Sequence, residues 1–97
     1  MKREEILTVL REHYSEITDR FGVKSVRLFG SKVRGEGGPG SDVDILVDFG
    51  GAAGFAQYMD LLFYLEDLLG TTVDLVTARG LRDELRSAIE REAVRVT

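Results

Sequence analysis

The sequence contains no cysteine and only one histidine and one proline. Without cysteine, the chain has no disulfide framework and no thiolate ligands for a metal. No apolar run is long enough to span a membrane, and the first residues lack the apolar core of a signal peptide. We therefore expect a cytoplasmic protein that does not bind membranes. The single histidine, His13, is expected to be a partly exposed helix residue without a catalytic role.

The charge balance is also informative. The 97 residues carry a net charge of -4, so a broad basic surface for general nucleic-acid binding is not expected. Hydrophobic residues make up 43% of the chain, which is ordinary for one small folded domain, and we expect residues 1–97 to form a single domain.

Apolar residues recur at helical spacing in three stretches, Lys2–Arg20, Phe55–Leu69 and Leu81–Val94. Gly22 and Gly70 suit the ends of the first two helices. The third helix is expected to turn five residues inward, namely Leu81, Leu85, Ala88, Ile89 and Ala93. The Phe55–Leu69 stretch is apolar well beyond the width of one buried face. Its extra surface either packs between the sheet and the first helix or meets another chain.

Three short β-prone segments are expected to be strands: Ser25–Phe29, Asp42–Phe49 and Thr71–Thr77. The first two are predicted to pair as a hairpin. The strand-helix-strand order that follows favours a right-handed crossover and a parallel pair between the second and third. The sequence therefore predicts an α/β fold on a small mixed sheet.

Carboxylates cluster at one end of this predicted sheet. Side chains alternate along a strand, so Asp42 and Asp44 point to the same face, and parallel pairing brings Asp74 near them. Adjacent like charges are costly unless a cation lies between them, and Mg²⁺ prefers such oxygen ligands. The residues after Asp44 are Ile-Leu-Val, which excludes an EF-hand loop. Asp74 is open to a second interpretation, as an isolated aspartate on an edge strand.

A Gly-Ser turn ends the first predicted strand next to these carboxylates. Gly30 permits close approach of the backbone to a ligand, and Ser31 is expected to cap one helical turn and to hold terminal phosphates. Arg34 either adds charge to the same phosphates or pairs with Glu36, Asp42 or Asp48. The Glu36–Gly40 segment is expected to be a mobile loop.

Gly30-Ser31, ten further residues and then Asp42-Val-Asp44 form a pattern that resembles the signature of the polymerase-β-type nucleotidyltransferase superfamily. The string GSKVRG…GSDVDILVDF is similar to its minimal nucleotidyltransferase branch, and the resemblance covers nearly the whole chain. It implies an α/β fold with about three helices. It also implies that ATP or another NTP and Mg²⁺, expected as two ions, meet at Gly30, Ser31, Asp42 and Asp44, with Asp74 as the third carboxylate.

The same resemblance implies a partner. Minimal members typically pair with a HEPN-domain toxin, for which the nucleotidyltransferase is the antitoxin. It can transfer AMP from ATP to a tyrosine of that toxin. Two hypotheses follow for this chain: an Mg²⁺-dependent protein adenylyltransferase, or a binding module that neutralises its partner by occlusion. A small molecule or an RNA end is a third, weaker possibility for the acceptor.

Overall fold

The computed structural model describes residues 2–35 and 42–96. The predicted loop at Glu36–Gly40 lies outside these residues. Within the described ranges, no helix combines the length and the apolar character needed to cross a membrane.

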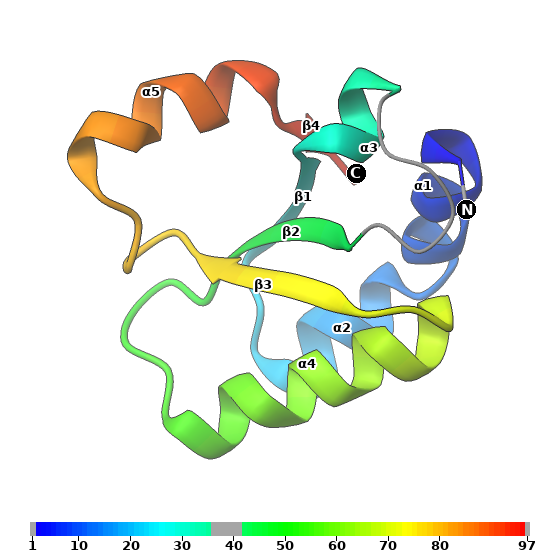
Figure 1. Cartoon of the computed structure of the whole chain (residues 1–97). Helices are drawn as coiled ribbons and strands as arrows, with labels where there is room; N and C mark the ends of the chain where they lie inside the picture. The colour runs from blue at the N-terminus through cyan, green and yellow to red at the C-terminus, as the bar shows by residue number, and fades with distance from the viewer. Residues whose placement is uncertain (1, 36–41, 97) are drawn as a thin grey trace.

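The described residues form a four-stranded mixed sheet. This sheet lies at the centre of the fold (Figure 1). Its strands are β1 (Ser25–Phe29), β2 (Val43–Asp48), β3 (Val73–Thr77) and β4 (Val94–Arg95), in the spatial order β3-β2-β1-β4. Strand β1 pairs antiparallel with both β2 and β4, whereas β2 and β3 are parallel. The predicted hairpin and the predicted parallel crossover are both confirmed.

In the described part of the chain, five helical segments accompany the sheet, where the sequence suggested about three. They are α1 (Arg3–Glu12), α2 (Tyr14–Phe21), α3 (Ser31–Arg34), α4 (Phe55–Leu69) and α5 (Asp83–Glu92). The expected helix over Lys2–Arg20 is divided at His13, whose backbone leaves helical geometry. The His13 ring nitrogen Nδ1 lies 2.9 Å from the Val9 carbonyl oxygen. Both halves bury their apolar side chains in the core. The break at His13 therefore bends the chain but leaves these side chains buried.

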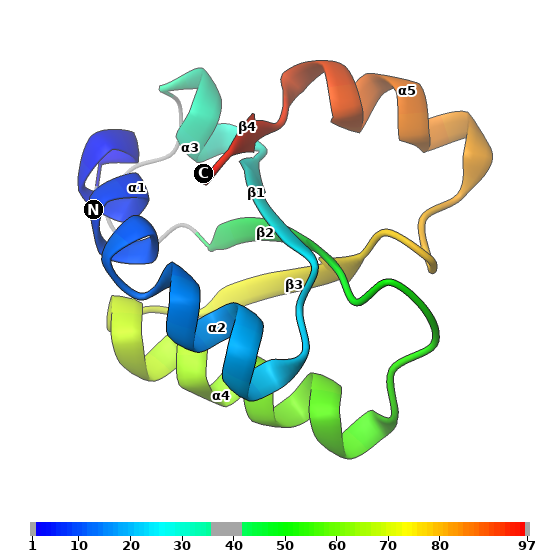
Figure 2. The same ribbon diagram turned by 180° about the vertical axis from the view of Figure 1, so that it is seen from behind.

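The main core lies on one face of the sheet, where α1, α2 and α4 pack (Figure 2). Alternate strand residues fill it, including Val26, Leu28, Val43, Ile45, Val47, Val73 and Leu75. On α4, only the narrow stripe of Leu61, Leu65 and Leu69 is buried. Phe55 and Phe63 of the same helix are 80% and 55% exposed. The chain's own core therefore buries only some of the apolar side chains of this helix.

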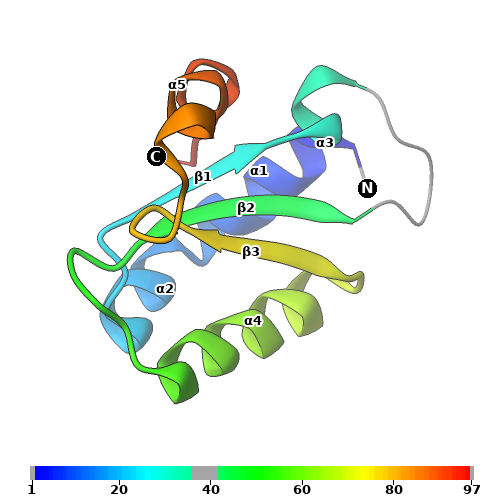
Figure 3. The ribbon, with the colours of Figure 1, turned by 60° about the vertical axis from the view of Figure 1, so that its left-hand side comes forward.

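Helix α5 stands on the other side of the sheet (Figure 3). It is shorter than predicted, none of its residues is buried, and Leu85 is 48% exposed rather than turned inward. The chain then leaves the helix to form β4, which the sequence analysis missed. A two-residue strand is too short to give a periodic signal. The strand is held by β1, and the Val96 N–H donates to the Val26 carbonyl at 3.1 Å.

Candidate active site

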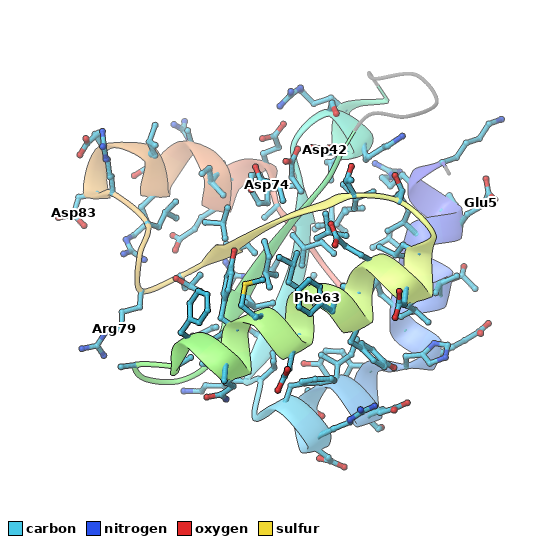
Figure 4. All side chains as sticks on the ribbon, turned by 60° about the horizontal axis from the view of Figure 1, so that its bottom comes forward. Glu5, Asp42, Phe63, Asp74, Arg79 and Asp83 are labelled. Atoms are coloured by element: carbon cyan, nitrogen blue, oxygen red, sulfur yellow. The ribbon has the colours of Figure 1, made fainter. Side chains whose placement is uncertain are left out.

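The carboxylates predicted to cluster do lie on neighbouring strands. In the parallel β2–β3 pair, Asp44 is directly opposite Asp74. Asp42 comes two residues before Asp44, just ahead of the strand. Figure 4 shows Asp42 and Asp74 close together on the face of the sheet away from α4. The α4 side receives Val43 and Ile45, which are fully buried. Strand alternation therefore separates the acidic face from the apolar core.

The Gly-Ser bend meets this acidic face directly. In the antiparallel β1–β2 pair, Phe29 is opposite Asp44, so the next residue, Gly30, lies beside the Asp44 side chain. Gly30 has φ 79° and ψ -155°, a backbone conformation that is essentially restricted to glycine. A Cβ atom built on Gly30 would lie 2.0 Å from Asp44 Oδ2. The absence of a side chain at Gly30 is what makes room for the Asp44 carboxylate.

The acidic neighbours of Asp44 affect its pKa. Burial, followed by the charges of Asp74 and Asp42 and a hydrogen bond with Asp74, raises the pKa of Asp44 above its ordinary value of 3.8. The positive charge of Arg34 acts in the opposite direction. In the absence of a metal ion, this arrangement makes Asp44 easier to protonate than an aspartate in water. A cation placed among the carboxylates would favour the ionised form instead.

This raised pKa predicts how stability depends on pH. In the metal-free protein, the unfolded chain releases the Asp44 proton at a lower pH than the folded chain does. The contribution of Asp44 to the free energy of unfolding should therefore decrease as pH rises from about 4 through the raised pKa. Thermal unfolding in a chelator, followed from about pH 4 to about pH 7, should show wild type losing stability relative to Asp44→Asn. A constant difference between the two proteins across this range would contradict the prediction.

Asp42 has a neighbour that the sequence analysis did not assign to the site. The Thr72 hydroxyl donates a hydrogen bond to Asp42 Oδ1. The backbone supports this contact, since the Val43 N–H donates to the Thr72 carbonyl at 3.1 Å. The signal was present in the sequence, because alternation puts Thr72 on the same face as Asp74. Thr72 therefore orients one of the three predicted carboxylates.

The donor set can be compared with the needs of a hard divalent cation. Asp44 and Asp74 lie within reach of each other and offer only oxygen atoms, which suits Mg²⁺. Within residues 2–35 and 42–96, however, no three acidic or histidine side chains converge as a ready-made metal group. Asp42 is directed to Thr72 and would have to turn to join the other two. The residues fit a cation in type and in position on the sheet, with Asp42 the side chain that must move.

Helix α3 carries the remaining predicted site residues. Ser31 is its first residue rather than its cap, because the N-cap position is occupied by Gly30. Arg34 forms an ion pair with Glu92 at the end of α5. Of the three acidic partners suggested by the sequence, Glu36 lies outside the described residues. Arg34 is nevertheless close enough to lower the pKa of Asp44. The Glu92 contact joins α3 to α5, on the side of the sheet that carries the carboxylates.

The fold and this arrangement define a class of protein. A small mixed sheet bears carboxylates on two parallel strands, and a Gly-Ser bend ends the adjacent antiparallel strand, as in polymerase-β-like nucleotidyltransferases. Residues 5–96 match the nucleotidyltransferase domain family, and the chain belongs to that family.

Individual relatives agree with this assignment. The protein adenylyltransferase MntA of Thermococcus cleftensis is 45% identical over 93 residues, which cover 96% of this chain and 94% of that protein. A solved structure of a minimal nucleotidyltransferase is 40% identical and covers 97% of this chain and 95% of its own, with a TM-score of 0.82. The polymerase-β-like fold predicted from the sequence is thereby confirmed.

A more distant structure shares the fold alone. It contains the tri-AMPylated HEPN toxin of Shewanella oneidensis in complex with its MNT antitoxin. The matched chain is 18% identical to this one, with a TM-score of 0.69, and the match covers 94% of this chain and 71% of that chain.

Proposed function

We propose that this chain is a protein adenylyltransferase that transfers AMP from ATP to a tyrosine hydroxyl of a HEPN-domain toxin and so acts as its antitoxin. The observation that carries the proposal is the register of β2 and β3, which sets Asp44 opposite Asp74 beside Gly30. The MntA relative, named a protein adenylyltransferase, supports the choice of AMP. The AMPylated toxin in the Shewanella complex supports the choice of partner. The reaction as proposed takes place in the cytoplasm.

The proposed step is an in-line displacement. The tyrosine oxygen attacks the α-phosphorus of ATP, an oxygen–phosphorus bond forms, and the bond from that phosphorus to the bridging oxygen breaks to release pyrophosphate. Asp74 accepts the hydroxyl proton, and because it is an exposed residue of the edge strand β3 it is open to an acceptor from outside the chain. Exposure of this carboxylate is what an acceptor supplied by another protein requires.

Mg²⁺ ions, when bound by Asp42, Asp44 and Asp74, would supply charge stabilisation to the attacking and leaving oxygens. The chain's own groups bind the rest of the nucleotide. Gly30 and Ser31 lie where the triphosphate would approach the backbone, and Gly30 is buried against Asp44. Arg34, held by Glu92 beside the carboxylates, adds a guanidinium that suits phosphate oxygens.

The test uses the product of the neighbouring gene, which the proposal expects to be a HEPN-domain protein, mixed with Mg²⁺ and ATP labelled at either the α- or the γ-phosphate. We expect the α-label, but not the γ-label, to become attached to a tyrosine of the toxin, with release of pyrophosphate. Toxin ribonuclease activity should fall as the label accumulates. An Asp44→Asn variant that neutralises the toxin fully, with no label transferred by wild type, would instead support the occlusion hypothesis.

Arg34 provides a further prediction. Replacing Arg34 by glutamine removes a charge that is placed to contact phosphate, so the KM for ATP should rise by about tenfold, with a smaller change in kcat. Glu92→Gln should have a smaller effect, because it loosens the support of Arg34 but leaves the guanidinium in place. Steady-state label transfer at varied ATP concentration measures both values. An unchanged KM in Arg34→Gln would assign Arg34 to a purely structural ion pair.

A further inference from the structure

A second surface of the molecule has chemistry that the proposed reaction does not use. It lies on the outside of α4, where Figure 4 shows Phe63 turned away from the sheet. Phe63 is 55% exposed and borders a hollow between α2 and α4. Asp60 and Asp67 stand one helical turn before and after Phe63, and Asp19 of α2 also lines the hollow. We call Asp19, Asp60, Phe63 and Asp67 the α4 surface.

The surface combines an aromatic ring with an acidic rim. All three of its carboxylates belong to exposed residues, so the charge is presented to solvent. An acidic rim repels nucleic acid and anionic membranes and attracts basic groups. The exposed ring presents apolar surface to water, and burying that surface against a partner is favourable. A cationic side chain with an apolar stem complements both features, and arginine is the best match because its guanidinium stacks on rings and pairs with carboxylates.

The chain already makes this type of contact with itself in the same hollow. The Arg20 guanidinium carbon lies 5.1 Å from the centre of the Phe21 ring and 5.6 Å from that of Tyr64. Arg20 also pairs with Glu16 at 3.2 Å. The internal example shows that rings and carboxylates at this edge of α2 and α4 accept a guanidinium. At Phe63, Asp60 and Asp67 offer a similar combination to an arginine from another chain.

The α4 surface is separate from the candidate active site. Helix α4 lies on one side of the sheet and α5 on the other (Figure 3). The α4 side receives Val43 and Ile45, and strand alternation puts Asp44 and Asp74 on the opposite face. A partner bound here does not fill the nucleotide site. The contact can therefore hold a partner whether or not its acceptor group is engaged at the carboxylates.

We propose that the α4 surface docks a basic segment of the toxin partner, with an arginine placed over Phe63 between Asp60 and Asp67. The identity of the partner rests on the proposed function, whereas the docking chemistry rests on the surface itself. This second contact anchors the partner on the face opposite the site of transfer.

Binding of the neighbouring gene's product, the expected HEPN-domain partner, measured without nucleotide, tests the proposal. Phe63→Ala should weaken the Kd by about tenfold or more, as expected for a central aromatic contact. The matched control is Phe55→Ala, an exposed phenylalanine on the same helix outside the hollow, which should stay within about twofold. An Asp60→Asn, Asp67→Asn double variant should also reduce the dependence of Kd on salt concentration, which a purely structural role would not change.

The outcomes separate this inference from the proposed function. Label transfer by wild type, with an unchanged Kd in Phe63→Ala and in the double variant, overturns the docking surface alone. No label transfer, with binding lost in Phe63→Ala but kept in Phe55→Ala, overturns the reaction and supports the surface. Absence of binding by wild type overturns the docking surface, and it overturns the reaction as well only if no label is transferred. Self-association of the chain that Phe63→Ala abolishes would assign the surface to a second copy and overturn the toxin as its occupant.

Discussion

Replacing Asp44 by asparagine should lower the rate of label transfer to the toxin by about a thousandfold or more. Asp44 lies at the centre of the site, opposite Asp74 in β3 and against Gly30. Removing its charge weakens cation binding there, and metal stabilisation of a transferring phosphoryl group is worth several kcal/mol, or about three powers of ten in rate. Single-turnover transfer of α-labelled ATP at saturating toxin measures the loss.

The same substitution should not destabilise the fold. The raised pKa of Asp44 shows that burial and its acidic neighbours oppose its charge, so the neutral amide relieves that cost. Asp48→Asn is a matched control on the same strand, because asparagine keeps the oxygen that accepts the Gly50 N–H at 2.7 Å. We expect unchanged transfer in Asp48→Asn. In a chelator near neutral pH, we expect the melting temperature of Asp44→Asn to be at or above that of wild type. Transfer at the wild-type rate by Asp44→Asn would contradict its assigned role.

Replacing Gly30 by alanine should cost both stability and activity. The new methyl group would occupy the position of Asp44 Oδ2, at 2.0 Å, and the backbone at φ 79° disfavours any side chain. Positive-φ strain of about 1–3 kcal/mol, together with the steric conflict, predicts a loss of roughly 2–4 kcal/mol in the free energy of unfolding. Because the carboxylate must shift to admit the methyl group, label transfer should fall further than stability alone explains.

Gly35 offers a close comparison for that experiment. Its φ of 75° is nearly the same, but a Cβ built there meets no atom of the described residues within 4 Å. Gly35→Ala should therefore cost only about 1 kcal/mol, from backbone strain. Denaturant unfolding of the two variants, with transfer assayed under conditions where both are folded, separates strain from the conflict with Asp44. Equal losses in the two variants would show that the Asp44 contact has no special importance.

The arrangement of the acidic face was predictable because strand alternation is a strong rule. The sequence placed Asp42 and Asp44 opposite to Val43 and Ile45, and the crossover rule placed Asp74 beside them. The register confirms the Asp44–Asp74 pairing. What the pattern could not supply is the orientation of side chains. The hydrogen bond from Thr72 to Asp42 depends on rotamers, which periodicity does not encode.

The sequence analysis missed features that depend on contacts between segments far apart in the chain or that leave the apolar pattern unchanged. A helical pattern over Lys2–Arg20 does not reveal a break at His13, because both halves continue the same apolar stripe. The pattern over Leu81–Val94 similarly hides the exit into β4, whose stability comes from pairing with β1 rather than from its own residues. Arg34 forms an ion pair with Glu92, which is 58 positions away along the chain and which the sequence analysis did not name. Sequence proximity does not reveal such long-range pairs.

The central claim is that Asp42, Asp44 and Asp74 together hold the cation that supports transfer. Crystals grown with Mn²⁺ and a non-hydrolysable ATP analogue test it most directly, since the anomalous signal locates the metal independently of any side-chain assignment. The account predicts a peak bonded to Asp44 and Asp74, with Asp42 turned away from Thr72 to join them. Nucleotide bound without a peak at these carboxylates, in crystals of a protein active in Mn²⁺, would contradict it.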